Sequence, residues 1–239
     1  MNPAEILILA VQFGIPLIFA ITLHEAGHAF AAKKLGDMTA AKEGRVSLNP
    51  IKHIDPFGTI LLPAMLYFLK APFLFGYARP VPVSYNKLRT LPRDIALVAV
   101  AGPAANFILI FLSAILFNLA FALPLSWQEP FAKMISISIV INTVLALFNL
   151  LPIPPLDGSK ILMALGPRSL GKVIYEMERY GMLIIIAILL LMPVFTSVLG
   201  FNPLAAFFGS AIKFVFHLVE PLTNIHCLFV DSDACKRVV

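Results

Sequence analysis

Four apolar runs dominate this sequence and limit the folds open to it. They cover residues 6–35, 95–123, 131–151 and 181–199, and each has about 20 residues or more, which is what an α-helix needs to cross a bilayer. Of the 239 residues, 59% are hydrophobic and only 13% are charged, against about a quarter charged in a soluble domain. In water such a chain would expose too much apolar surface. We therefore predict an all-α polytopic membrane protein.

The predicted bundle contains about four to six transmembrane helices. Residues 203–219 form another apolar run, but a lysine and a histidine interrupt it, so this helix is expected either to lie at the interface or to span. Residues 57–76 are apolar but broken by prolines, so they could span or could dip in and return. We favour a re-entrant segment or a β-hairpin inserted after the first helix. We expect one intramembrane domain over residues 1–220 and a tail over residues 221–239.

Basic residues gather between the apolar runs. The stretches 33–55, 77–94 and 153–180 are rich in Lys and Arg, whereas the loop 124–133 has a single lysine. Because cytoplasmic loops carry the excess of positive charge, we predict that the three basic stretches are cytoplasmic and that residues 57–76 enter and leave on the same side. The net charge of +5 does not indicate nucleic-acid binding, since no basic stripe with interleaved aromatics is present.

The first apolar run contains the motif His24-Glu25-Ala26-Gly27-His28. Positions i and i+4 of a helix share one face, so His24 and His28 can offer two imidazoles to one metal ion. Glu25 lies on an adjacent face and can act as general base toward a water molecule, which is the logic of the H-E-x-x-H zinc motif. The alternatives are a polar contact within the bundle or a proton relay, although three ionisable groups are expensive inside an apolar helix.

A catalytic zinc ion needs a third protein ligand and one open position. The candidates elsewhere in the chain are Glu43, His53, Asp55, Asp157, His217 and His226. Asp157 is favoured because it follows an apolar run in the segment Asn149-Leu-Leu-Pro-Ile-Pro-Pro-Leu-Asp157-Gly158, where prolines prevent a regular helix. Irregular backbone at membrane depth is tolerated only where it is buried or lines a wet cavity. The alternative is a loop in which Asp157 caps the following helix.

Three motifs together resemble the site-2 protease family of intramembrane zinc metalloproteases. They are the H-E-x-x-H motif, the segment Gly102-Pro103-Ala104-Ala105-Asn106, and the segment from Asn149 to Gly158, in the order that the family has them. The likeness runs from about Leu23 to Leu162. Further segments are similar to the short prokaryotic branch that has no PDZ or CBS domain: Gly36-Asp37, Gly44-Arg45, Leu48-Asn49-Pro50, His53 to Gly58, and Arg79-Pro80-Val81-Pro82-Val83.

This resemblance implies a function and a set of site residues. His24, His28 and Asp157 would bind one Zn²⁺ per chain, Glu25 would be the catalytic base, and Asn149 would assist near the scissile carbonyl. The expected substrates are transmembrane proteins or peptides, cleaved within the lipid bilayer of the cell membrane at a site toward the cytoplasm. For Asn106 the sequence leaves a functional role and a role in helix packing equally open.

Two other functions compete with the protease. Intramembrane His, Glu and Asp residues also mark transporters and ion pathways, which would predict inverted repeats that this sequence does not have. A non-catalytic membrane scaffold would predict loss of the base or of a ligand, yet all four residues are present.

Overall fold

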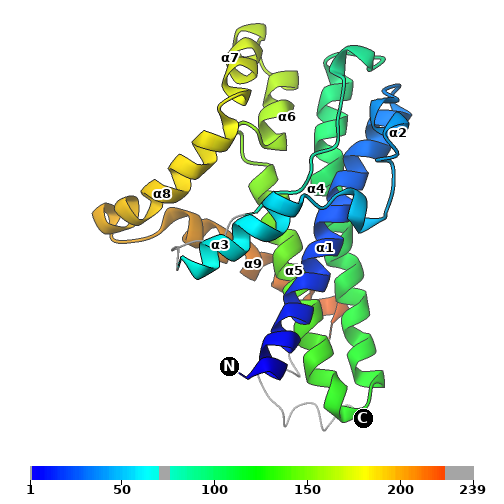
Figure 1. Cartoon of the computed structure of the whole chain (residues 1–239), viewed down its shortest axis with the longest axis vertical. Helices are drawn as coiled ribbons and strands as arrows, with labels where there is room; N and C mark the ends of the chain where they lie inside the picture. The colour runs from blue at the N-terminus through cyan, green and yellow to red at the C-terminus, as the bar shows by residue number, and fades with distance from the viewer. Residues whose placement is uncertain (1, 70–75, 224–239) are drawn as a thin grey trace. The chain divides into compact units, whose positions relative to one another are not determined.

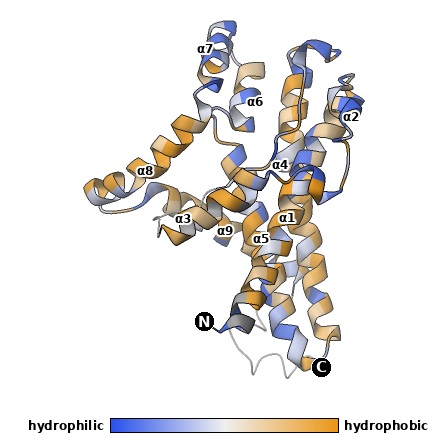
Figure 2. Ribbon diagram, viewed as in Figure 1, coloured by the Kyte–Doolittle hydropathy of each residue, from blue (hydrophilic) through white to orange (hydrophobic). Residues whose placement is uncertain are grey.

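The computed structural model describes residues 2–69 and 76–223, and this part of the chain is built mainly from helices. Five of the described helices are long and apolar enough to cross a membrane. They are built on α1 (Pro3–Lys34), α4 (Arg93–Phe117), α5 (Leu125–Asn149), α8 (Gly181–Leu199) and α9 (Pro203–Val219). Figure 2 shows hydrophobic residues along most of α1, α4 and α8. The prediction of an all-α multi-pass membrane protein is confirmed.

Shorter elements connect the long helices. The elements after α1 are α2 (Thr39–Lys42), η1 (Pro50–Lys52), the π-helical turn η2 (Pro56–Leu61), α3 (Leu62–Phe68) and η3 (Tyr85–Lys87). The short helix η4 (Asn118–Ala122) extends α4, and η5 (Glu220–Leu222) follows α9. Between α5 and α8 lie α6 (Asp157–Leu165) and α7 (Arg168–Glu178). The described residues of the insertion after α1 contain short helices and extended chain but no strand. The β-hairpin, which was one of the two predicted forms, is therefore not seen in these residues.

Helix α1 is longer than a bilayer needs. Its 32 residues correspond to about 48 Å, and the helix continues through Pro16. It ends at Lys33 and Lys34, whose positive charges complement the negative end of the helix dipole. The motif with the two histidines therefore lies in the C-terminal third of one continuous helix.

The described residues form two compact units, each assembled from segments that are far apart in the sequence. Figure 1 labels the helices that these segments contain. In its described part, the first unit contains residues 2–20, 106–146 and 204–223. Its core is one cluster of Ile110, Ala114, Ile139, Val215 and Val219 and a second of Phe117, Ala120, Ala132 and Ile135. These clusters bring the second half of α4 against α5 and α9.

The second unit carries the three predicted zinc ligands. Its described part contains residues 21–69, 76–105 and 147–203. Within it α1 and α4 pack closely at Gly27, where a β-carbon would lie 2.6 Å from the carbonyl oxygen of Ala101. A β-carbon on Gly158 would lie 2.1 Å from the carbonyl oxygen of Leu150, so only glycine fits the turn behind Asp157. Close approaches of this kind hold the irregular segment before α6 in one position.

Candidate metal centre

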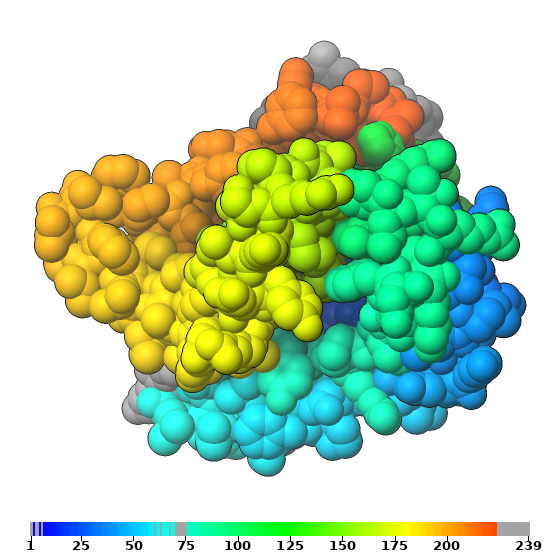
Figure 3. Space-filling view, turned by 90° about the horizontal axis from the view of Figure 1, so that it is seen from above, coloured from blue at the N-terminus to red at the C-terminus, as the bar shows by residue number. Residues whose placement is uncertain are grey.

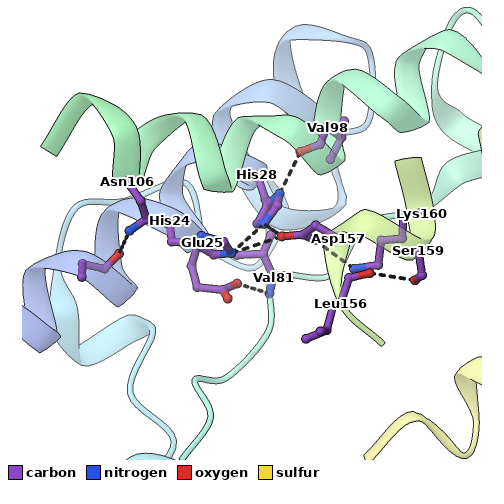
Figure 4. Close-up of polar contacts among 11 residues, drawn as sticks. His24, Glu25, His28, Val81, Val98, Asn106, Leu156, Asp157, Ser159 and Lys160 are labelled. Atoms are coloured by element: carbon purple, nitrogen blue, oxygen red, sulfur yellow. Dashed lines mark hydrogen bonds and ion pairs between the residues drawn. The ribbon is translucent and has the colours of Figure 1, made fainter. Parts of the chain in front are cut away.

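The two histidines of α1 are buried and face the same point. His24 is 5% exposed and His28 is 8% exposed, and their Nε2 atoms lie 3.2 Å apart. Their separation by four residues places both on one helix face, as the sequence predicted. Figure 4 shows the two imidazoles side by side, turned toward Asp157.

Asp157 reaches this point from a distant part of the chain. It is the first residue of α6 and is 4% exposed, and its Oδ2 lies 3.3 Å from Nε2 of His24 and 3.1 Å from Nε2 of His28. The N-cap of α6 is Leu156, so the competing role of Asp157 as a helix cap is not seen. The ligand atoms of the three residues all lie within 4.8 Å of one another. The structure therefore brings together the three residues that the sequence singled out as metal ligands.

The chemistry of this cluster fits a cation. Nδ1 of His28 lies 2.8 Å from the carbonyl oxygen of Val98, which can only accept, so the proton of a neutral imidazole sits on Nδ1 and leaves a lone pair on Nε2. Asp157 Oδ2 is buried and, despite its short contacts to the imidazoles, receives no hydrogen bond. Two imidazoles and a carboxylate are a ligand set of catalytic zinc, which keeps a fourth position open. The bond to Val98 is the type of outer contact that orients a ligating histidine.

Helix α4 makes room for the imidazoles through Gly102. A β-carbon at this position would lie 2.3 Å from Nε2 of His28 and 2.8 Å from Cε1 of His24. The absence of a side chain at Gly102 thus lets α4 pass directly beside the cluster. This role of Gly102 could not be predicted from the sequence.

The charge of Asp157 is fixed by its neighbours. Burial alone would raise the pKa of this carboxyl, but the imidazoles of His24 and His28 and the nearby ammonium of Lys160 outweigh burial and hold the pKa well below its ordinary value. Lys160 Nζ lies 3.4 Å from Oδ1, which leaves Oδ2 as the oxygen that faces the histidines. The carboxylate is therefore ionised at neutral pH and oriented toward the cluster. Lys160 is a neighbour that sequence reasoning missed.

Glu25 lies next to the cluster on α1 and is partly buried. Its Oε2 accepts a hydrogen bond of 2.9 Å from the backbone N–H of Val81, in the extended chain before η3 (Figure 4). This contact joins the H-E-x-x-H motif to the segment around Arg79-Pro80-Val81, for which the resemblance to the family implies no role.

The other candidate ligands do not join the cluster in the described part of the chain. His53 is buried and bonds to a backbone carbonyl through Nε2, and the Asp55 carboxylate caps η2. Glu43 and His217 are exposed. His226, like both cysteines of the predicted tail, lies outside the described residues.

The two asparagines of the sequence motifs have different surroundings. Asn149 is the last residue of α5 and is partly buried. Asn106 is fully buried in the first unit, where its side-chain nitrogen donates to the carbonyl oxygen of Ala20 at 3.2 Å and to Oδ1 of Asn142 at 2.8 Å. Of the two roles left open for Asn106, these bonds between helices favour packing.

Comparison with known proteins places the chain in a family. The sequence profile described as "Peptidase family M50" matches residues 122–192. "Putative zinc metalloprotease YwhC" of Bacillus subtilis (strain 168) is 42% identical over 178 residues, which are 73% of this chain and 78% of that protein. The chain belongs to peptidase family M50. This membership confirms the resemblance to site-2 proteases and the prediction of a zinc metalloprotease.

Two further relatives are less similar to this chain. "Putative zinc metalloprotease Rip2" of Mycolicibacterium smegmatis is 30% identical over 175 residues, which are 72% of this chain and 64% of that protein. The protein of the same name from Mycobacterium tuberculosis (strain H37Rv) is 32% identical over 145 residues, which are 59% of this chain and 52% of that protein. No solved structure matches this chain.

Proposed function

We propose that this zinc metalloprotease hydrolyses peptide bonds of membrane-embedded polypeptides with Glu25 as general base. The observation that carries the proposal is the convergence, within 4.8 Å, of two imidazole nitrogens from a helix apolar enough to cross a membrane and one buried carboxylate oxygen. The ligands would be His24, His28 and Asp157, and we expect one zinc ion per chain.

Zinc bound at this site supplies a Lewis acid that polarises oxygen atoms. The residues of the chain handle the protons. Glu25 takes a proton from the attacking water and returns it to the leaving amine, which is the usual sequence for a positioned general base. The side-chain amide of Asn149 donates to the oxyanion that develops on the scissile carbonyl. Lys160 holds Oδ1 of Asp157, so that the ligand carboxylate keeps its orientation during turnover.

A membrane site must also admit water and an unwound substrate, because the carbonyls of a helix are engaged in internal hydrogen bonds. If Lys33 marks the interface, His28 lies about 8 Å and His24 about 14 Å along α1 inside it, which is shallow enough for access from the cytoplasm. Figure 3 shows a hollow on one face of the second unit, between α6–α7 and the start of α4. These are the elements that carry Asp157 and Gly102, so the hollow supports entry from this side.

The test of this function is Glu25→Gln. The substitution keeps the size of the side chain and removes the base, so turnover should fall by about 10²–10⁴-fold or more while zinc is retained. Zinc is measured by mass spectrometry of the detergent-purified chain, with His217→Ala as a control that should keep both zinc and activity. Membrane polypeptides that co-purify with the Glu25→Gln chain and not with the wild type would identify substrates. Wild-type turnover in this variant would refute the role of Glu25.

Orientation is tested separately by labelling single cysteines. After replacement of the native cysteines, positions Lys42, Arg89 and Lys172 should label only after permeabilisation, and Trp127 should label from outside, because the first three lie in the basic stretches. Labelling of position 89 from outside would show that residues 57–76 cross the membrane once. The proposed protease site would not be affected, since its residues are argued independently of this crossing.

A further inference from the structure

The extended segment Arg79–Ser84, which we call the strap, donates a backbone hydrogen bond to the side chain of Glu25. The donor is Val81 N–H, 2.9 Å from Oε2. This bond engages one lone pair of Oε2 and fixes the direction in which the carboxylate points. The orientation of Glu25 therefore depends on where the strap lies.

The sequence of the strap prepares it for this contact. Pro80 and Pro82 flank Val81, and proline has no backbone N–H and a fixed φ near −65°. A residue before proline is also restricted to extended conformations, which applies to Arg79 and Val81. The strap is consequently stiff, and Val81 supplies the single amide donor between the two prolines.

Arg45 fastens the N-terminal end of the strap. Its side chain is buried, at 5% exposed, although it belongs to an irregular loop. Nη2 donates to the carbonyl oxygen of Arg79 at 2.5 Å and to that of Pro80 at 3.4 Å. The second of these carbonyls belongs to the same peptide group as Val81 N–H, so Arg45 and Glu25 hold opposite sides of one peptide plane.

Asp37 fastens the C-terminal end. This carboxylate is fully buried, and its Oδ2 accepts from Ser84 N–H at 2.6 Å while Oδ1 accepts from Thr39 N–H at 2.9 Å. The strap is thus held at both ends by buried charged side chains that lie outside the zinc cluster. Buried charges are costly unless they are paired, so two of them at the ends of one short segment indicate that the position of this segment matters for function.

We propose that Arg45 is a positioning residue for the protease reaction: by fixing the Pro80–Val81 peptide, it orients the Glu25 carboxylate for proton transfer. The inference rests on the proposed function, because it matters for turnover only if Glu25 is the base. It assigns a role to the Gly44-Arg45 and Arg79-Pro80-Val81 segments, which contribute no zinc ligand.

The first test uses amide hydrogen exchange and needs neither zinc nor substrate. In full-length metal-free chain labelled with ¹⁵N-valine, Arg45→Met should speed exchange of the Val81 amide by about tenfold or more, as expected for loss of a charge-assisted hydrogen bond. Glu25→Ala should have the same effect, whereas the Val83 amide should change little in Glu25→Ala. Unchanged exchange at Val81 in Arg45→Met would overturn the proposal.

The second test separates chemistry from binding. The probe is a quenched-fluorescent 25-residue Leu/Ala transmembrane peptide with a central Asn-Pro helix break, chosen from a set varied at the break as the one that the wild-type chain cleaves fastest. Arg45→Met should lower kcat by about 10–100-fold with KM within about twofold and zinc content unchanged. Arg45→Lys, which keeps one donor, should recover part of the loss.

Lys172→Met is the matched control, because it removes one positive charge from an exposed position of α7 that lies outside the strap and outside the Gly44-Arg45 segment. It should leave kcat and Val81 exchange unchanged. Should Arg45→Met fail to fold, replacement of Val81 by its α-hydroxy acid removes the N–H alone and should lower kcat similarly, with Val83 replaced in the same way as its control.

The outcomes distinguish this inference from the proposed function. A rise in KM at constant kcat would mean that the strap contacts substrate and does not position Glu25, and would overturn the inference. Faster Val81 exchange with unchanged kcat would overturn it as well, while loss of turnover in Glu25→Gln would still support the base. Wild-type turnover in Glu25→Gln would overturn both.

Discussion

The two units bury polar side chains in apolar helices in opposite ways. In the first unit, donors meet acceptors: the amide of Asn106 meets Oδ1 of Asn142, and the hydroxyls of Ser113 and Ser138 lie 2.9 Å apart. In the second unit, two imidazoles and a carboxylate converge on one point, as a set of groups that can ligate a cation. A buried acceptor without a donor is destabilising unless a cation satisfies it.

This difference distinguishes a structural contact from a site. Complementary pairs between helices stabilise a bundle modestly, by about 0.6 kcal/mol on average in membrane proteins. A convergence of two imidazoles and a carboxylate instead matches the ligand set of a catalytic zinc ion. Burial and helix position alone would not separate the two sets, because Asn106 and Asn142 are even more deeply buried than His24 and His28.

The largest effect on zinc affinity is expected from a substitution that gives the second unit a donor–acceptor pair like that of Asn106 and Asn142 in the first unit. Asp157→Asn replaces a charged acceptor by an amide that can donate to the His28 lone pair. Zinc affinity should fall by about 100-fold or more, because a ligand is lost outright and even outer contacts are worth 10–100-fold. Competition with a chromogenic zinc chelator measures the affinity.

Stability of the metal-free Asp157→Asn chain provides the control for this comparison. In excess chelator its unfolding temperature should fall only a little below that of the wild type, because the amide keeps the size of the carboxylate and loses only the charge contacts with the imidazoles and Lys160. Wild-type zinc affinity in this variant would show that the third ligand lies elsewhere.

A smaller effect is expected from Gly102→Ala, which leaves every ligand in place. The added β-carbon would lie 2.3 Å from Nε2 of His28, so the imidazole or α4 must move. We expect zinc affinity to fall by about tenfold, since misplaced ligands bind more weakly. Gly14→Ala on α1 is the control, because a β-carbon there meets nothing within 4 Å. Equal affinities in the two variants would contradict the close approach of α4.

The smallest effect is expected in the first unit. Asn106→Ala removes the bonds to Ala20 and Asn142 and should lower the free energy of unfolding by about 1 kcal/mol, with zinc content and kcat unchanged. Reversible unfolding in bicelles measures the loss. A drop in kcat at full zinc occupancy would instead favour the functional role that the sequence left open for Asn106.

The sequence predicted much of this protein because its strongest signals are local. Length and hydropathy suffice to locate helices such as α4 and α8, since a bilayer requires about 20 apolar residues in succession. The four-residue spacing of His24 and His28 requires only a helix to place both on one face. Local reasoning was weaker for the insertion after α1, where prolines and mixed polarity admitted a β-hairpin as well as the short helices η2 and α3.

The tertiary structure alone decided which distant groups meet. Sequence left six candidates for the third ligand, and the packing of α6 beside α1 brings Asp157 to His24 and His28. Helix packing likewise decided that Gly102 faces the imidazoles. The course of the chain after α1 decided that the backbone N–H of Val81 reaches Glu25, which is 56 positions away in the sequence. The physical reason is that helical periodicity fixes neighbours within a few residues, whereas contacts between segments depend on how whole helices pack against one another.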